Sequence, residues 1–152
     1  MAIEFKGRVA IVTAAGGGLG RQHALALAAR GAKVVVNDLG GAVDGSGGSV
    51  SAAQAVVDEI RAAGGEAIAN GASVTDFAAV QAMVQQAVDT WGRVDILVNN
   101  AGILRDKSFA KMDVADFRLV LDVHLMGAVH CCKAVWPHMI AQQYGRIVMT
   151  TS

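Results

Sequence analysis

The chain has 152 residues, of which 53% are apolar and 17% charged, and its thirteen basic residues balance its thirteen acidic ones. This composition favours one folded domain with a sizeable core and excludes a disordered chain. A net charge of zero makes nucleic acid and anionic membrane surfaces poor candidates for a partner.

The chain shows none of the usual signs of a membrane, disulfide-bonded or metal-binding protein. No apolar run approaches the roughly 20 residues that span a bilayer, and the first eight residues lack the basic-then-apolar order of a signal peptide. The two cysteines, Cys131 and Cys132, are adjacent and cannot join distant segments, and no paired Cys or His spacing typical of a metal site occurs. We therefore expect a cytoplasmic or organelle-matrix protein without a bound metal.

Short apolar runs without alternation occur along the chain, which is typical of strands buried on both faces of a parallel sheet. They predict strands at residues 9–12, 34–36, 67–69, 96–98 and 147–149. Segments with helical periodicity lie between them, at 19–30, 51–63, 77–90 and 114 to about 136. This alternation predicts a Rossmann-type, doubly wound parallel α/β sheet of five βα units, a single dinucleotide-binding domain over residues 1–152.

Several local features refine these elements. Asp76 is the expected N-cap of the third helix. Pro137 is expected to end or kink the fourth, because it removes a backbone donor. That helix is apolar over a wide face, which favours a subunit interface there. The glycine-rich stretch at 40–48 is expected to be a mobile loop.

A glycine-rich turn follows the first predicted strand and opens the first helix. Glycines there allow the backbone to approach a pyrophosphate, which the amides of the helix N-terminus stabilise. Such turns are common and specify no ligand by themselves. The candidate cofactor-binding residues of this turn are Thr13, Gly16, Gly18, Leu19 and Gly20.

The second predicted strand leads into Asp38, about 20 residues beyond the glycine turn, as the dinucleotide fingerprint requires. A carboxylate there accepts hydrogen bonds from both hydroxyls of an adenosine ribose and repels a 2′-phosphate, which favours NAD over NADP. Two alternatives remain open from the sequence. Asp38 could be a solvent-facing loop acid, and Arg21 offers a counter-charge for a phosphate.

The order of the glycine turn, Asp38 and the quartet Asn99-Asn-Ala-Gly102 resembles the short-chain dehydrogenase/reductase family. From the residues alone, the amides of Asn99 and Asn100 can bridge backbone groups or meet a ligand. The resemblance implies that the cofactor's ribose and nicotinamide lie beside Asn100, Ala101 and Gly102. It also implies that the adenine lies beside Ser73 and Val74, although the family more often has an acid in place of Ser73.

Within the family, segments 34–41, 99–106, 123–125 and 144–150 look like the (3R)-hydroxyacyl-CoA dehydrogenase units of type 2 peroxisomal multifunctional enzymes and their bacterial relatives. This resemblance implies hydride transfer from a secondary alcohol, at carbon three of an acyl-CoA, to NAD. It further implies a homodimer or homotetramer, and a peroxisomal matrix location in a eukaryote. No residue of the chain independently indicates a CoA site.

Two residues depart from the family pattern. Ala14 stands where the family usually has a glycine, which is tolerable at negative φ and costly otherwise. His124 stands where most members have an asparagine that helps to hold a proton-relay water, and the resemblance makes it a catalytic candidate. Its position on the apolar stripe of the fourth helix equally fits a histidine buried in the core.

The last residue, Ser152, aligns with the family's catalytic serine. The family's Tyr-x-x-x-Lys pair is absent from these residues, since Tyr144 is followed four positions later by Val148. Alcohol oxidation needs a base that takes the hydroxyl proton, so we expect a chain truncated before that pair and inactive by itself. The alternatives are a non-catalytic dinucleotide-binding module and a hydrolase with Ser152 as nucleophile, although the latter lacks a glycine-flanked elbow.

Overall fold

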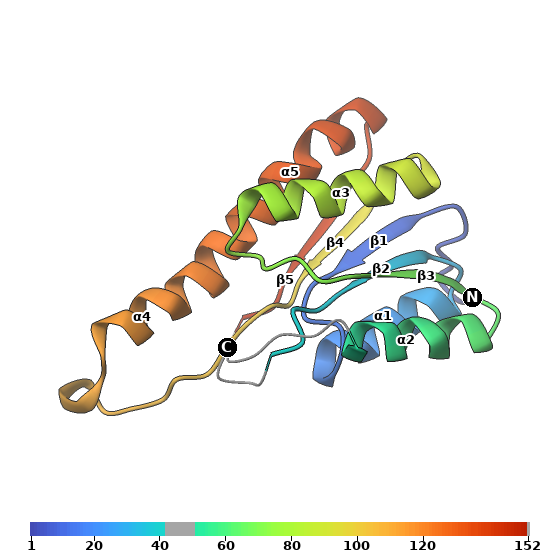
Figure 1. Cartoon of the computed structure of the whole chain (residues 1–152). Coiled ribbons are helices and arrows are strands. Elements are labelled where there is room, and N and C mark those ends of the chain that lie inside the picture. The colour runs from blue at the N-terminus through green and yellow to red at the C-terminus, as the bar shows by residue number, and fades with distance from the viewer. Residues whose placement is uncertain (42–50, 152) are drawn as a thin grey trace.

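A five-stranded parallel sheet forms the centre of the computed structural model, which describes residues 1–41 and 51–151 (Figure 1). The strand order is β3-β2-β1-β4-β5, so the order reverses between β1 and β4. A crevice at the carboxyl ends of the strands is expected at that reversal. The predicted doubly wound α/β fold is confirmed. The strands are β1 (Val9–Val12), β2 (Lys33–Asn37), β3 (Glu66–Asn70), β4 (Ile96–Asn99) and β5 (Arg146–Met149).

Helices cover both faces of this sheet. Helices α1 (Gly18–Ala29) and α2 (Ser51–Ala62) lie on one face, and α3 (Phe77–Trp91) and α5 (Gly127–Gln142) lie on the other (Figure 1). Alternate residues of a strand therefore pack into different clusters: Val12 packs with the α1 and α2 side, and Ile11 with the α3 and α5 side. This double burial explains why the strands are apolar without alternation.

The predicted fourth helix differs from the sequence-based expectation. It begins as α4 (Val114–Leu121) after a short 3-10 turn (Phe109–Lys111), continues through a π-helical turn at Asp122–Met126, and becomes α5. Of the two expectations for Pro137, an end or a kink of the helix, the first is wrong, because α5 runs on to Gln142.

Packing explains why α5 tolerates its proline. Pro137 has no N–H to donate, but Val135 before it and Met139 after it are both buried against the α3 side of the sheet. Tertiary contacts on both sides of the proline therefore hold the helix together. The Asp76 cap of α3 is confirmed, since its carboxylate accepts a hydrogen bond from Ala79 N. Of the predicted glycine loop, residues 42–48 lie outside the described residues.

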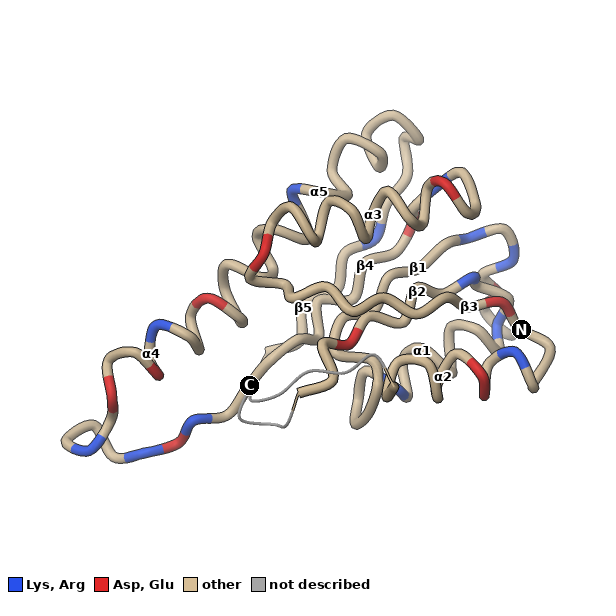
Figure 2. The backbone as a smooth tube through the Cα atoms, viewed as in Figure 1, with Lys and Arg blue, Asp and Glu red and all other residues tan. Residues whose placement is uncertain are grey.

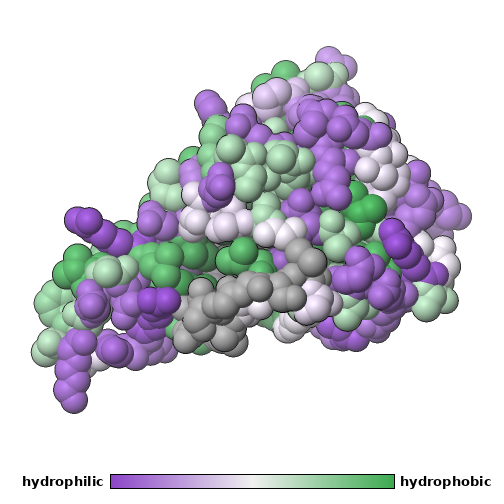
Figure 3. Space-filling model, in the orientation of Figure 1, coloured by the Kyte–Doolittle hydropathy of each residue, from purple (hydrophilic) through white to green (hydrophobic). Residues whose placement is uncertain are grey.

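An exposed apolar stripe runs along α4 and α5. Hydrophobic side chains gather on the arm of the molecule that α4 forms (Figure 3). Val114–Gln142 is long and apolar enough to cross a membrane by length and composition alone, a test that the core helix of a soluble protein also passes. Such a stripe is the kind of face that another protein surface covers. Its large residues are Phe117, Leu121, Leu125, Val129, Trp136 and Ile140.

Charged residues lie around the sheet rather than in the middle of its strands (Figure 2). Among the charged side chains that the structure describes, that of Asp95, just before β4, is fully buried. It accepts hydrogen bonds from Val9 N at 2.9 Å and from the guanidinium groups of Arg8 and Arg93. Burial alone would raise the pKa of Asp95, but these donors outweigh it and the pKa is lowered. Asp95 thereby joins β1 and β4 at the end of the sheet opposite the crevice.

Candidate functional site

The carboxyl ends of β1 and β4 are joined by two side chains. The Thr13 hydroxyl is buried and accepts hydrogen bonds from Asn100 N at 3.0 Å and Ala101 N at 2.9 Å. The Asn100 amide donates back to Thr13 O at 3.2 Å and Ala14 O at 3.4 Å. Both side chains thus bond to the protein itself, and they hold the glycine turn against the segment that begins at Asn100.

The glycine turn leaves the N-terminus of α1 open. Gly17, the N-cap residue, provides no side-chain cap, and an added Cβ at Gly17 or Gly18 would meet no atom within 4 Å. Leu19 is also exposed, at 66%. Gly20 is the opposite case, because a Cβ there would overlap Ala14 O and the Asn100 amide. An uncapped helix N-terminus with open space in front of it fits a pyrophosphate.

Ala14 adopts a left-handed backbone conformation, with φ of +50°. The sequence left open whether alanine is tolerable here, and a positive φ is the unfavourable case, because Cβ crowds the following carbonyl. The neighbouring bonds of Asn100 to Thr13 O and Ala14 O hold the backbone in this conformation.

Asp38 lies at the end of β2 and is half-buried, so the interpretation as a solvent-facing loop acid is wrong. Its Oδ2 accepts a hydrogen bond from Gly16 N at 2.8 Å, and its Oδ1 accepts one from Gly40 N at 2.6 Å. Gly16 has to be a glycine for this approach, since a Cβ there would be 2.7 Å from Asp38 Oδ2. Arg21, the alternative counter-charge for a phosphate, is paired with Glu59 at 2.6 Å.

A pocket of about 360 Å³ opens at the carboxyl ends of β1, β4 and β5. It brings together four of the predicted site residues: Thr13, Val74, Ala101 and His124. Gly16, Gly18, Leu19 and Gly20 lie in the turn that follows Thr13, and Asp38 bonds this turn through Gly16 N. Ser73, Asn100 and Gly102 neighbour lining residues without lining the pocket themselves. The other lining residues are Asn99, Val123, Leu125, Gly127, Ala128, Met149, Thr150 and Thr151.

His124 lies in the π-helical turn, is exposed and lines the pocket, so the interpretation as a core histidine is wrong. Its Nε2 is 3.0 Å from both Ile103 N and Ile103 O. This nitrogen can accept from the N–H or donate to the carbonyl, according to the tautomer. The ring also packs closely on Gly102, where a Cβ would be 2.8 Å from His124 Cε1. A π-helical turn is rare and frequently marks a functional site.

Ser152 lies outside the described residues. The two residues before it, Thr150 and Thr151, line the pocket, and the Thr150 hydroxyl donates to Asn100 Oδ1 at 3.4 Å. The sequence reasoning did not single out Thr150 as a site residue. Its position directly after the fifth apolar run was the signal that could have identified it, because strand ends meet at this edge of the sheet.

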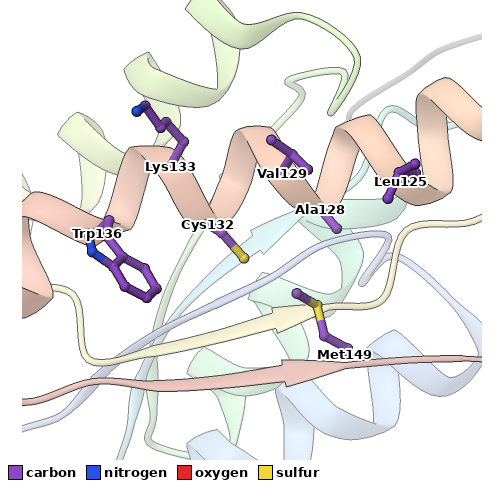
Figure 4. Close-up of a pocket in the computed structure, with 7 residues that line it drawn as sticks. All are labelled: Leu125, Ala128, Val129, Cys132, Lys133, Trp136 and Met149. Atoms are coloured by element: carbon purple, nitrogen blue, oxygen red, sulfur yellow. The ribbon is translucent and has the colours of Figure 1, made fainter.

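A second, more apolar pocket of about 430 Å³ lies between α5 and β5. Cys132 on α5 and Met149 on β5 point toward one another across it (Figure 4). The buried Asn99 amide donates to both sulfur atoms, at 3.4 Å and 3.3 Å. Asn99 therefore links β4 to α5 and β5 through side-chain sulfur atoms, whereas the bridging of backbone groups that the sequence left open is made by Asn100.

The chain resembles known proteins over nearly its whole length. The family described as short chain dehydrogenase matches residues 8–152. Peroxisomal multifunctional enzyme type 2 of Drosophila melanogaster is 58% identical over 150 residues, which are 99% of this chain and 25% of that protein. A short chain dehydrogenase from Mycobacterium avium is 50% identical with a TM-score of 0.85, over 97% of this chain and 53% of that one.

A further solved structure is a 7α-hydroxysteroid dehydrogenase complexed with NADH and 7-oxo glycochenodeoxycholic acid. It is 37% identical with a TM-score of 0.88, over 98% of this chain and 55% of that one. The chain thus spans a quarter of the Drosophila relative and about half of each solved structure.

Proposed function

Because the chain belongs to the short chain dehydrogenase family, we propose that it forms the dinucleotide-binding part of an oxidoreductase that transfers hydride between a secondary alcohol and NAD. The observation that carries the proposal is the Asp38 carboxylate, bonded to Gly16 N at 2.8 Å beside an open helix N-terminus. This arrangement offers one group for a ribose and another for a pyrophosphate. The comparisons lend no support to a non-catalytic module.

The preference for NAD over NADP rests on charge. The Asp38 carboxylate is fixed by two backbone amides, so it cannot easily swing away from a ribose 2′-phosphate. The guanidinium that could neutralise such a phosphate, Arg21, is bonded to Glu59 instead. The fixed Asp38 carboxylate would therefore repel a 2′-phosphate, which favours the 2′-hydroxyl of NAD.

The nicotinamide of the bound cofactor would supply the hydride acceptor. The α1 amides and Asp38 would hold the adenosine half, while Ala101 and Gly102 would form the wall beside the nicotinamide. His124 would orient that wall through Ile103 and move a proton at Nε2. Ser152 would bind the substrate oxygen; the two residues that precede it in the sequence, Thr150 and Thr151, line the pocket.

We propose a 3-hydroxyacyl-CoA as the substrate class, because the Drosophila relative is a peroxisomal multifunctional enzyme and the chain matches it over 150 residues. That relative also supports the peroxisomal matrix as the location in a eukaryotic source; for any other source we propose the cytoplasm. The exposed stripe on α4 and α5 supports a homodimer or homotetramer, since monomers rarely expose so continuous an apolar face.

Calorimetry with NAD and NADP tests the cofactor proposal on the chain itself. We expect NAD to bind more tightly than NADP, and Asp38→Ala to weaken NAD binding about tenfold or more, because it removes a charged hydrogen-bonding group. Asp38→Asn should reduce the difference in affinity between NAD and NADP, because the amide carries no charge that repels a 2′-phosphate. Asp58→Ala is the matched control, an exposed α2 acid that bonds only Gln54 among the described residues. Equal binding of both dinucleotides by the unaltered chain would refute the NAD preference.

The activity is tested on the protein as its gene encodes it in full, with 3-hydroxyacyl-CoA and NAD as substrates. We expect NADH formation that Ser152→Ala abolishes and that Asp58→Ala leaves unchanged. Oxidation of other secondary alcohols without oxidation of 3-hydroxyacyl-CoA would refute the substrate class and leave the oxidoreductase proposal intact.

A further inference from the structure

A histidine that none of the proposed steps uses contacts the loop after β3. His130 lies in the first turns of α5, and its Nδ1 is 2.7 Å from Val74 O, across 56 positions of sequence. A carbonyl can only accept, so Nδ1 carries the hydrogen and donates it. The ring also packs against Phe77, the first residue of α3, with ring centres 5.3 Å apart. His130 therefore bonds the loop and touches the helix that follows it.

Three successive carbonyls of the β3–α3 loop accept hydrogen bonds. Ala72 O accepts from the Asn37 amide of β2 at 2.9 Å, and Ser73 O accepts from Asp76 N at 3.1 Å. Val74 O, the third, is the one that His130 holds. Two of these bonds come from the sheet and from the loop itself, whereas the third comes from α5. The position of Val74 relative to the pocket therefore depends on His130.

Helix α5 meets Val74 at a second point. A Cβ at Gly127 would be 2.6 Å from Val74 Cγ2, so the valine side chain packs directly on the helix backbone. Val74 is 7% exposed and forms part of the 360 Å³ pocket wall together with Gly127. The same continuous helix carries His124, six positions before His130, on the other part of that wall.

We propose that His130 is a positioning residue for the dinucleotide: its bond to Val74 O holds the β3–α3 loop, which the family resemblance implies to lie beside the adenine, against α5. The inference rests on the proposed function. A loop that is already ordered loses less conformational freedom when a ligand binds, so this bond raises affinity without touching the ligand. It acts on cofactor binding and leaves the hydride-transfer step unchanged.

Two substitutions separate the hydrogen bond from the ring. His130→Phe keeps an aromatic ring against Phe77 and removes the donor, whereas His130→Asn removes the ring and places an N–H near the position of Nδ1. His138→Phe, eight positions further along α5, is the matched control. Calorimetry on the chain gives the Kd of NADH and of ADP-ribose, and kinetics on the protein encoded by the full gene give KM and kcat.

We expect His130→Phe to raise the Kd of NADH and of ADP-ribose about 3- to 10-fold, the effect of one hydrogen bond. The KM for the cofactor should rise with it while kcat is unchanged, and His130→Asn should recover most of the affinity. Gly127→Ala, which pushes Val74 from the other contact, should weaken binding in the same direction and covers the case in which His130→Phe does not fold.

Unchanged affinity in His130→Phe, or no recovery in His130→Asn, would overturn the inference and leave the proposed function standing. A fall in kcat at unchanged KM would also overturn it, because it would place His130 in the chemical step. If the unaltered chain binds neither NADH nor ADP-ribose, the proposed function fails and this inference fails with it.

Discussion

Ala14→Gly is predicted to stabilise the chain, because Ala14 has φ of +50°. A left-handed conformation costs a residue with a Cβ about 1–2 kcal/mol. Glycine avoids this cost but loses about 0.5–1 kcal/mol more conformational entropy on folding than alanine does. At the midpoints of these two ranges the net gain in the free energy of unfolding is about 0.75 kcal/mol, which corresponds to a rise in Tm of about 1.5–3 °C for a chain of this length.

Urea unfolding followed by circular dichroism measures this gain, and Gln143→Gly is the matched control. Gln143 has φ of +52° at the C-terminal end of α5, far along the chain from the glycine turn. Both substitutions should stabilise by similar amounts, and neither should weaken NAD binding. If Gln143→Gly stabilises and Ala14→Gly does not, the strain argument is refuted at Ala14.

Three further outcomes are expected. Gly20→Ala should abolish dinucleotide binding or folding, because a Cβ there overlaps the backbone of the turn. Circular dichroism measures folding and calorimetry measures binding, so the two effects can be distinguished. Retained binding would contradict the packing argument. Asp95→Asn should lower the free energy of unfolding at neutral pH by about 1–3 kcal/mol, the cost of disturbing a buried charged network. Because the pKa of Asp95 is lowered in the folded chain, its contribution to stability is complete above the ordinary carboxyl range and is lost as the pH falls through the folded pKa. Below a pH of about 4, the urea midpoint should therefore fall less steeply with pH in Asp95→Asn than in the unaltered chain. Burial, with a smaller contribution from Cys132, raises the pKa of the Cys131 thiol to about 12, so iodoacetamide at pH 8 should label Cys132 alone in the folded chain and both thiols in urea, as mass spectrometry can show.

The fold could be predicted because its signals are local. Each strand is a short apolar run, and its burial on both faces removes the alternation that would otherwise be expected. The alternation of strands and helices then leaves few topologies, of which the doubly wound sheet is the observed one. The glycine turn and Asp38 were predictable for the same reason, since both are read at fixed positions relative to the strand ends.

The errors concern residues whose environment comes from distant parts of the chain. Pro137 was expected to end or kink its helix, but the helix continues, and burial of Val135 and Met139 holds it on both sides of the proline. His124 was left open between a core histidine and a catalytic candidate, and the structure places it exposed, in a π-helical turn that lines the pocket. Neither packing nor a change in helical period is visible in the order of residues nearby.

The sequence by itself therefore determined the sheet, the layers of helices and the edge of the sheet at which we expect a ligand to bind, because apolar periodicity and glycine placement act over a few residues. Only the tertiary structure decided the backbone conformation of Ala14, the exposure of His124 and the bond from His130 to Val74. These depend on contacts between segments tens of residues apart, whose geometry exists only after the chain has folded.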